Sequence, residues 1–245
     1  MMRPDTGARE LGEHGLGVLA SGPELRVADD QRELGGAGIS AGSGPPGQRP
    51  ALPPGQYIPR TLPVLHYGPV PAFNPQTWDL RVVGATESAT EARLSWDDVA
   101  ALPVSEVTAD FHCVTKFTVP AIRWGGVLAT EILRCYPPAA AVTHVMIWAD
   151  FGYSANIRIG DFAAEDTLLA MYRDGARLTP DHGYPLRLVV PSLYAWKSVK
   201  WVRAIEYLTA DRRGFWEERG YHNVADPWQE QRYSYQERAG EGPPL

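Results

Sequence analysis

Lysine is nearly absent from this 245-residue sequence, and only three of its 23 basic residues are lysines: Lys116, Lys197 and Lys200. With a net charge of −6 and no basic stripe, the sequence lacks the clustered cations that a dedicated nucleic-acid-binding surface needs. Cysteine is also scarce, because only Cys113 and Cys135 occur. Two cysteines outside any CxxC pattern exclude a scaffold held by several disulfides and a zinc finger, and leave one disulfide between them open.

Long apolar runs are missing as well. No stretch approaches the roughly 20 apolar residues that a membrane-spanning helix needs. Residues 1–10 carry charges of both signs and Pro4, and no apolar segment follows them as it would in a secretory signal. We therefore expect a cytoplasmic protein without a membrane span, and the 44% hydrophobic content predicts a packed core.

Composition divides the chain into three parts. Residues 1–55 are rich in Gly, Pro, Glu, Arg and Ser, which predicts a disordered N-terminal tail. Whether these residues all belong to the native protein stays open. Residues 56–210 should form the folded domain. Residues 211–245 are polar and aromatic, and should form a C-terminal extension that packs on the domain or trails from it.

The residue patterns within the domain predict a mixture of short strands and helices. Residues 61–73 contain too many prolines for a helix or a central strand and should form an extended strap. Ser95 should cap a short helix. No regular alternation of strands and helices and no GxGxxG sequence is present, which argues against a dinucleotide-binding fold and favours a mixed α+β class. We expect strands at 78–84, 106–113, 142–149, 186–191 and 201–208, and a hairpin through Gly152. Helices are expected within 94–103, at 161–172 and around 215–220. Another short helix should follow a turn at Gly125 and Gly126 and end at residue 134.

Cys113 is the first candidate for chemistry. It follows a predicted strand and is flanked by His112 and Lys116, which could favour its thiolate. A thiolate is either a nucleophile or a ligand for a soft metal. A free cysteine is also often a small buried apolar residue, and the residues alone do not choose among these roles.

A second candidate region spans residues 181–201. His182 and Arg187 lie around a predicted buried strand, and a loop bearing Lys197, Ser198 and Lys200 follows. A cationic loop rich in donors at a strand end suits a phosphate. Arg187 needs an acceptor for its donors, which a ligand or a carboxylate of the protein such as Asp150 or Asp161 could provide. In the strap, His66 and Tyr67 would face a ligand or pack on the surface.

Together these stretches resemble the molybdopterin-binding domain of the sulfite oxidase family, including its methionine-sulfoxide-reductase-like branch. The resemblance covers about residues 57–208. It depends on four sequence blocks in order: Leu65-His-Tyr-Gly-Pro-Val-Pro, Cys113 with Trp124-Gly-Gly downstream, Asp181-His-Gly-Tyr-Pro-Leu-Arg-Leu-Val-Val-Pro, and Lys197-Ser-Val-Lys-Trp.

The resemblance implies a sulfite-oxidase-like α+β fold that holds molybdenum-molybdopterin, with Cys113 as the catalytic metal ligand. Such an enzyme would transfer an oxygen atom to or from a small substrate, namely an S-oxide, an N-oxide or a sulfur oxyanion. The protein would orient and tune the cofactor, which performs the redox chemistry. The implied cofactor-binding residues are His66, Tyr67, Cys113, His182, Arg187, Ser198, Lys200 and, through its backbone, Val199.

The sequence departs from the family members that oxidise sulfite, which line an anion pocket with arginines. Leu65 stands in the strap, Phe117 and Thr118 follow the cysteine, and Lys116 is the nearby cation. Sulfite is therefore a doubtful substrate, and a neutral S-oxide or N-oxide fits as well. The chain has no room for the haem or dimerisation domains of some relatives, so we expect a separate electron-transfer protein.

Two other functions stay open from the residues alone. A cysteine enzyme would use Cys113 as nucleophile and His182 as base, because His112 should point to the opposite face of the strand. A binding module would keep the fold without the cofactor.

Overall fold

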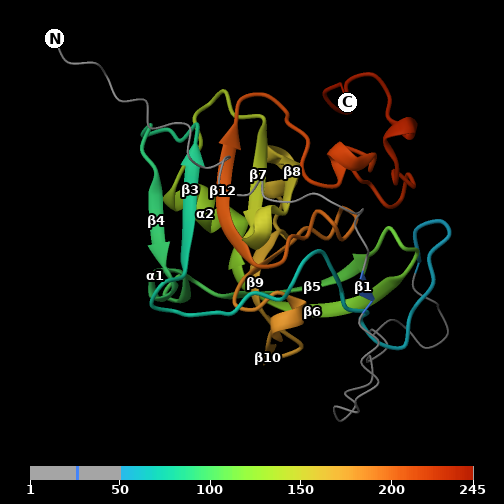
Figure 1. Cartoon of the computed structure of the whole chain (residues 1–245), viewed down its shortest axis with the longest axis horizontal. Coiled ribbons are helices and arrows are strands. Elements are labelled where there is room, and N and C mark those ends of the chain that lie inside the picture. The colour runs from blue at the N-terminus through green and yellow to red at the C-terminus, as the bar shows by residue number, and fades with distance from the viewer. Residues whose placement is uncertain (1–25, 28–50, 245) are drawn as a thin grey trace.

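The computed structural model describes residues 26–27 and 51–244, and it confirms the predicted α+β class. Two five-stranded sheets form the body of the protein (Figure 1). The expected disordered tail of residues 1–55 lies outside the described residues, apart from residues 26–27 and 51–55. In the described part of the chain, no helix has the length and apolar character to cross a membrane.

The first sheet contains most of the predicted strands. Its order is β4, β3, β12, β7 and β8, and β12 runs parallel to β3 while every other neighbouring pair is antiparallel. The bounds are Asp79–Gly84 for β3, Ala92–Ser95 for β4, His144–Ala149 for β7, Ser154–Arg158 for β8 and Val202–Leu208 for β12. The hairpin predicted through Gly152 joins β7 to β8.

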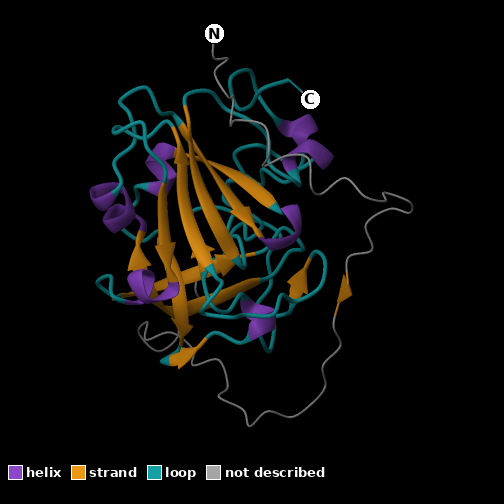
Figure 2. Ribbon diagram, turned by 60° about the vertical axis from the view of Figure 1, so that its left-hand side comes forward, coloured by secondary structure: helices purple, strands orange, loops and turns teal. Residues whose placement is uncertain are grey.

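The second sheet crosses beneath the first (Figures 1 and 2). Its order is β10, β9, β6 and β5, and β11 pairs with β9 beside this path. The bounds are Ser105–His112 for β5, Thr118–Leu128 for β6, Leu168–Arg173 for β9, Ala176–Arg177 for β10 and Arg187–Val189 for β11. Apolar side chains of both sheets, among them Val82, Ile147, Ile205, Val127 and Leu188, share one core.

The helices are short and lie at the ends of strands. Ser95 caps α1 (Trp96–Ala100) as predicted, in a capping box with Asp98. The others are α2 (Ala129–Cys135), α3 (Ile159–Phe162) and the single 3₁₀ turns η1 (Asp150–Gly152), η2 (Pro180–His182), η3 (Glu217–Arg219) and η4 (Ser234–Gln236). In the strap, β2 (Leu65–His66) pairs with β1 (Arg26–Val27).

The turn predicted at Gly125 and Gly126 is wrong, because β6 continues through both glycines. A Cβ atom at Gly126 would lie 2.1 Å from the carbonyl oxygen of Leu169 on β9. The pairing of β6 with β9 also shifts register between the two glycines. These glycines therefore permit a close approach of two strands, which is the other common reason for glycine inside a strand.

The helix predicted for residues 161–172 is also wrong. The helical turn α3 ends at Phe162, and residues 168–173 form the central strand β9. Leu168, Leu169 and Ala170 are all fully buried, because β9 is covered on both faces. When every residue of a short run is apolar, the spacing of apolar residues does not distinguish a strand from a helix.

Residues 211–244 follow β12 and run in a mostly irregular path, drawn in red in Figure 1. Arg213 donates to the carboxylate of Glu237 and to the carbonyl oxygen of Pro243. Asn156 of β8 donates through its side-chain amide to Asp211 and Asn223. The helix expected around 215–220 is limited to the 3₁₀ turn η3. The hydrogen bonds hold this C-terminal segment beside the first sheet.

Candidate active site

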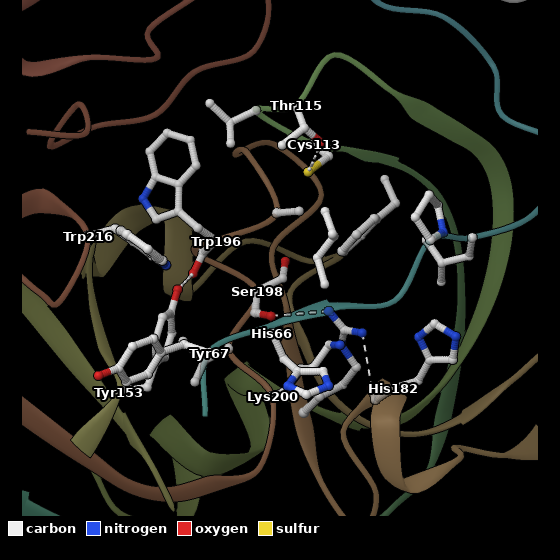
Figure 3. Close-up of a pocket in the computed structure, with 18 of the residues that line it drawn as sticks. His66, Tyr67, Cys113, Thr115, Tyr153, His182, Trp196, Ser198, Lys200 and Trp216 are labelled. Atoms are coloured by element: carbon white, nitrogen blue, oxygen red, sulfur yellow. Dashed lines mark hydrogen bonds between the residues drawn. The ribbon is translucent and has the colours of Figure 1, made fainter. Parts of the chain in front are cut away.

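A hollow opens between the strap, the turn after β5, the loop before β12 and the C-terminal segment. Its empty volume is about 940 Å³, which includes the mouth to solvent. Figure 3 shows Cys113 at one end and His66, Lys200 and His182 toward the other. All eight residues that the sequence singled out as cofactor ligands line this one hollow: His66, Tyr67, Cys113, His182, Arg187, Ser198, Val199 and Lys200.

Cys113 is held on a tight turn between β5 and β6. Its N–H donates to the carbonyl of Phe117 at 2.8 Å, and its carbonyl accepts from the N–H of Lys116 at 3.0 Å and from Nε2 of Gln56 at 3.1 Å. The hydroxyl of Thr115 donates to Sγ at 3.1 Å. Both cysteines are free, so Sγ of Cys113 is available to a ligand.

The expectation that His112 and Lys116 favour the Cys113 thiolate is wrong. His112 lies outside the hollow and its Nδ1 pairs with the hydroxyl of Thr118 at 2.9 Å. Lys116 is exposed and also lies outside the hollow. Burial raises the pKa of the Cys113 thiol, and hydrogen bonding from Thr115 offsets this in part. The opposite orientation of His112 follows from the alternation of side chains along β5.

Arg187 occupies the cationic end and has no carboxylate partner among the described residues. Its guanidinium donates to the carbonyls of His182 and Ser198, each at 3.1 Å, and stacks near Phe111 and Trp124. Of the two partners that the sequence left open for Arg187, a ligand or a carboxylate of the protein, the structure shows no carboxylate among the described residues. Nε of Arg187 is buried without an acceptor, which is costly unless a ligand supplies one.

The other titratable groups at this end are pushed toward their neutral forms. Burial, followed by the charge of Arg173, lowers the pKa of His182 to about 3. Burial and then Arg187 lower the pKa of Lys200 to about 7. The pKa of Arg187 itself falls to about 9, again through burial and Arg173. No aspartate or glutamate of the described chain lines the hollow, so this end fits an anion.

Lys197 does not belong to this cationic group, although the sequence placed it in the same loop. Its Nζ lies 2.6 Å from Oε1 of Glu217 and 2.8 Å from acceptors of Asn156 and Asn223. The side chain is fully buried on the far side of the loop and lines no part of the hollow. The prediction of Lys197 as part of a phosphate-binding loop is therefore wrong, whereas Ser198 and Lys200 do face the hollow.

The sequence reasoning missed the aromatic wall of the hollow. Tyr153, Trp196, Trp216 and Tyr221 line one side, and the last two come from the C-terminal segment. The hydroxyl of Tyr153 donates to the carbonyl of Trp196 at 2.7 Å (Figure 3). The rings of Trp196 and Tyr221 lie 5.1 Å apart. The aromatic-rich composition of residues 211–245 was the available signal, but composition does not say which rings reach a site.

The donor set has a defined chemistry. A single soft sulfur faces the hollow at one end, and an unpaired guanidinium nitrogen with further cationic groups lies at the other. The described residues contain no group of three or more His, Cys, Asp or Glu side chains able to hold a bare metal ion. The lining of the hollow therefore suits an organic anionic cofactor. Molybdopterin, which carries a phosphate and presents its metal through sulfur, fits these residues.

Comparison with known proteins gives the family. The chain belongs to the oxidoreductase molybdopterin binding domain family, whose sequence profile matches residues 67–216. The uncharacterized oxidoreductase YuiH of Bacillus subtilis (strain 168) is 41% identical over 185 residues, which are 75% of this chain and 92% of that protein. The predicted family, the class of molybdopterin-dependent oxidoreductase and the molybdenum-molybdopterin cofactor are thus confirmed.

More distant relatives include mitochondrial sulfite oxidase of Rattus norvegicus, with 29% identity over 182 residues, and the protein-methionine-sulfoxide reductase catalytic subunit MsrP of Campylobacter jejuni, with 26% over 162 residues. The matches cover 62% and 59% of this chain, and 33% and 54% of those proteins. The sulfane dehydrogenase SoxCD of Paracoccus pantotrophus shares the fold, with a TM-score of 0.57 and 16% identity over 86% of this chain and 58% of that one.

Proposed function

We propose that this domain is an oxygen-atom-transfer enzyme in which Cys113 ligates the molybdenum of molybdopterin. The observation that carries the proposal is the shared hollow, which Cys113 and Arg187 both line and which no carboxylate of the described residues lines. A soft thiolate suits a metal that is already bound to sulfur. Bound in this hollow, the cofactor supplies the two-electron redox chemistry and the oxygen atom or its acceptor.

The other residues position the cofactor. We assign the phosphate to Arg187 and Lys200, which bring positive charge to this end, and to His182, whose neutral ring can donate an N–H there. Ser198 and the backbone of Val199 would hold the pterin from the loop before β12, and His66 and Tyr67 from the strap. Tyr67 packs on Phe215 at a ring distance of 4.5 Å, which fixes it against the C-terminal segment.

The surroundings of Cys113 favour a neutral oxide over sulfite as substrate. Leu65, Val114, Thr115 and Phe117 lie in this part of the lining and bring no cation. The aromatic wall completes an apolar enclosure, in which a charged sulfur oxyanion would lose hydration without a partner. We propose an S-oxide or N-oxide as the substrate class, in keeping with the methionine-sulfoxide reductase among the relatives.

A separate electron-transfer protein would exchange electrons with the metal, because no described residue of this chain forms a second metal site. This partner and the cytoplasmic location stay predictions. The chain spans about one third of the sulfite oxidase that it matches, so the partners of that whole protein are not carried over.

The cysteine-nucleophile alternative is weaker in this geometry. Figure 3 shows His182 at the cationic end of the hollow, apart from Cys113. Burial raises the pKa of the thiol, and the pKa of His182 is lowered to about 3, so neither group favours a thiolate–imidazolium pair. A cofactor-free binding module would leave the buried Arg187, which has no carboxylate partner among the described residues, without an anion beside it.

Metal and pterin analysis tests the proposal. The protein is produced in a host that makes molybdopterin, and molybdenum and pterin are measured per chain. We expect about one molybdenum and one pterin per chain in the unaltered protein. Cys113→Ser should lose the molybdenum or its thiolate absorption band, and the matched control Cys135→Ser should keep both. Reduction of dimethyl sulfoxide and of trimethylamine N-oxide, compared with sulfite oxidation, then tests the substrate class. Full metal content and an unchanged spectrum in Cys113→Ser would contradict the ligand assignment.

A further inference from the structure

Thr115 makes a contact that the proposed function does not use. Its hydroxyl lies 3.1 Å from Sγ of Cys113 and donates a hydrogen bond to it (Figure 3). A hydroxyl bound to a thiolate is a charge-assisted donor, which is stronger than a donor to a neutral acceptor. The bond joins two residues of one turn, so any metal held by the sulfur would feel this donor directly.

Hydrogen bonds fix the backbone of the turn that carries Cys113 and Thr115. Hydrogen bonds from Cys113 to Phe117 and from Lys116 to Cys113 close the turn, and Gln56, which precedes the strap, donates to the carbonyl of Cys113. On the other side, the guanidinium of Arg232 donates to the carbonyl of Val114. The backbone that carries the sulfur and its donor is therefore held by the turn itself, by Gln56 and by the C-terminal segment.

The surroundings make the hydrogen bond more effective. Cys113 is 7% exposed, and this burial is the main cause of the raised pKa of its thiol. Lys116, which the sequence suggested as its neighbour in charge, is exposed and lies outside the hollow. Thr115 is exposed, so the bond is desolvated at its sulfur end, where low polarity strengthens it electrostatically.

We propose that Thr115 is a positioning residue that tunes the bond between the Cys113 sulfur and the metal. The inference depends on the proposed role of Cys113 as ligand. Donation to the sulfur draws charge from it and stabilises the reduced, more electron-rich metal, so the hydroxyl raises the reduction potential. Hydrogen bonds to ligating sulfurs are a general means of setting such potentials.

The test uses the holoprotein with Thr115→Val, which removes the hydroxyl and keeps the branched shape, and Thr115→Ser, which restores the donor. Molybdenum content, the midpoint potential from redox titration followed by electron paramagnetic resonance, and the sulfur-to-molybdenum absorption band are measured. In Thr115→Val we expect the ratio of oxidised to reduced metal at a fixed potential to rise tenfold. This corresponds to a midpoint potential lower by about 59 mV for a one-electron couple. The absorption band should move to lower energy. Thr115→Ser should return both values toward the unaltered protein.

The outcomes separate this inference from the ligand assignment. Loss of molybdenum in Cys113→Ser, together with an unaltered potential and band in Thr115→Val, would overturn the role of Thr115 and leave the ligand in place. An unaltered metal site in Cys113→Ser would overturn the ligand assignment first. If Thr115→Val binds too little metal for titration, the pair Thr115→Ser and Thr115→Ala repeats the comparison. Equal potentials in that pair would again refute the inference.

Discussion

Lys197 and Glu217 form an ion pair at 2.6 Å in which the two side chains are 1% and 0% exposed. Oε1 of Glu217 also accepts a hydrogen bond from Nε1 of Trp196 at 2.9 Å. Trp216 precedes Glu217 and Ser198 follows Lys197 in the sequence, and both Trp216 and Ser198 line the hollow. The pair therefore joins the loop that carries Ser198 to the C-terminal segment that carries the aromatic wall.

Removing one partner of this pair should be costly. Lys197→Met leaves the Glu217 carboxylate buried without its cation, and we expect a loss of about 3–5 kcal/mol in the free energy of unfolding. Urea denaturation of the apoprotein measures this loss. Arg134→Ala, which breaks the exposed Arg134–Glu131 pair, is the matched control and should cost about 0–1 kcal/mol. A cost below 1 kcal/mol for Lys197→Met would contradict the prediction, and Lys197→Met with Glu217→Leu should recover part of the loss.

His182 should make the apoprotein sensitive to acid. Its pKa is lowered to about 3 by burial and by Arg173, against about 6.5 in the unfolded chain. Between pH 6.5 and 3 the unfolded state binds a proton at His182 and the folded state does not. The contribution of neutral His182 to the free energy of unfolding is therefore complete above pH 6.5 and is lost as the pH decreases toward 3. When the pH is lowered from 7.5 to 4.5, we expect the free energy of unfolding of His182→Gln to fall by about 2 kcal/mol less than that of the unaltered protein. Urea denaturation at both pH values measures this difference. The same loss in both proteins would refute this assignment.

Lys200 should take up a proton when an anion binds. Burial and Arg187 lower its pKa to about 7, so at pH 8 most of it is neutral. A phosphate beside it would favour the charged form and raise the pKa. Titration calorimetry of the apoprotein with pyrophosphate at pH 8, in buffers of different ionisation enthalpy, should show uptake of a fraction of one proton. The uptake should disappear in Lys200→Met, and binding without proton uptake in the unaltered protein would contradict the role of Lys200.

The site was more predictable from sequence than parts of the fold. Cys113 and Arg187 could be found because a thiol after a strand and an arginine on an apolar strand each demand an unusual environment. The spacing of apolar residues in a buried segment carries less information. The pattern of residues 161–172 favours a helix, but β9 is a strand covered on both faces, so Leu168, Leu169 and Ala170 are all buried whichever face they point to. Lys197 was misassigned because spacing in a loop does not give the direction of a side chain. The contacts of Trp216 and Tyr221 are long-range and leave no local pattern.

Gly183 is required by the cationic end of the hollow, and its replacement gives a test that leaves every charged group in place. It follows η2 with a φ of +109°, a conformation that side chains rarely adopt. A Cβ atom here would lie 2.9 Å from Cβ of Arg187 and 3.3 Å from Cβ of Lys200. We expect Gly183→Ala to displace these two residues, to reduce the pterin and molybdenum content severalfold and to destabilise the apoprotein by about 1–3 kcal/mol.

The control for this change is Gly160→Ala. Gly160 lies in α3, where nothing stands within 4 Å of an added Cβ atom, and alanine favours a helix over glycine by roughly 1 kcal/mol. Cofactor content should therefore stay unchanged in Gly160→Ala while stability is kept or rises slightly. Because Gly183 carries no polar side chain, loss of cofactor in Gly183→Ala alone would trace binding to the placement of Arg187 and Lys200. Normal cofactor content in Gly183→Ala would mean that the cationic end tolerates this displacement and that the phosphate is held elsewhere in the hollow.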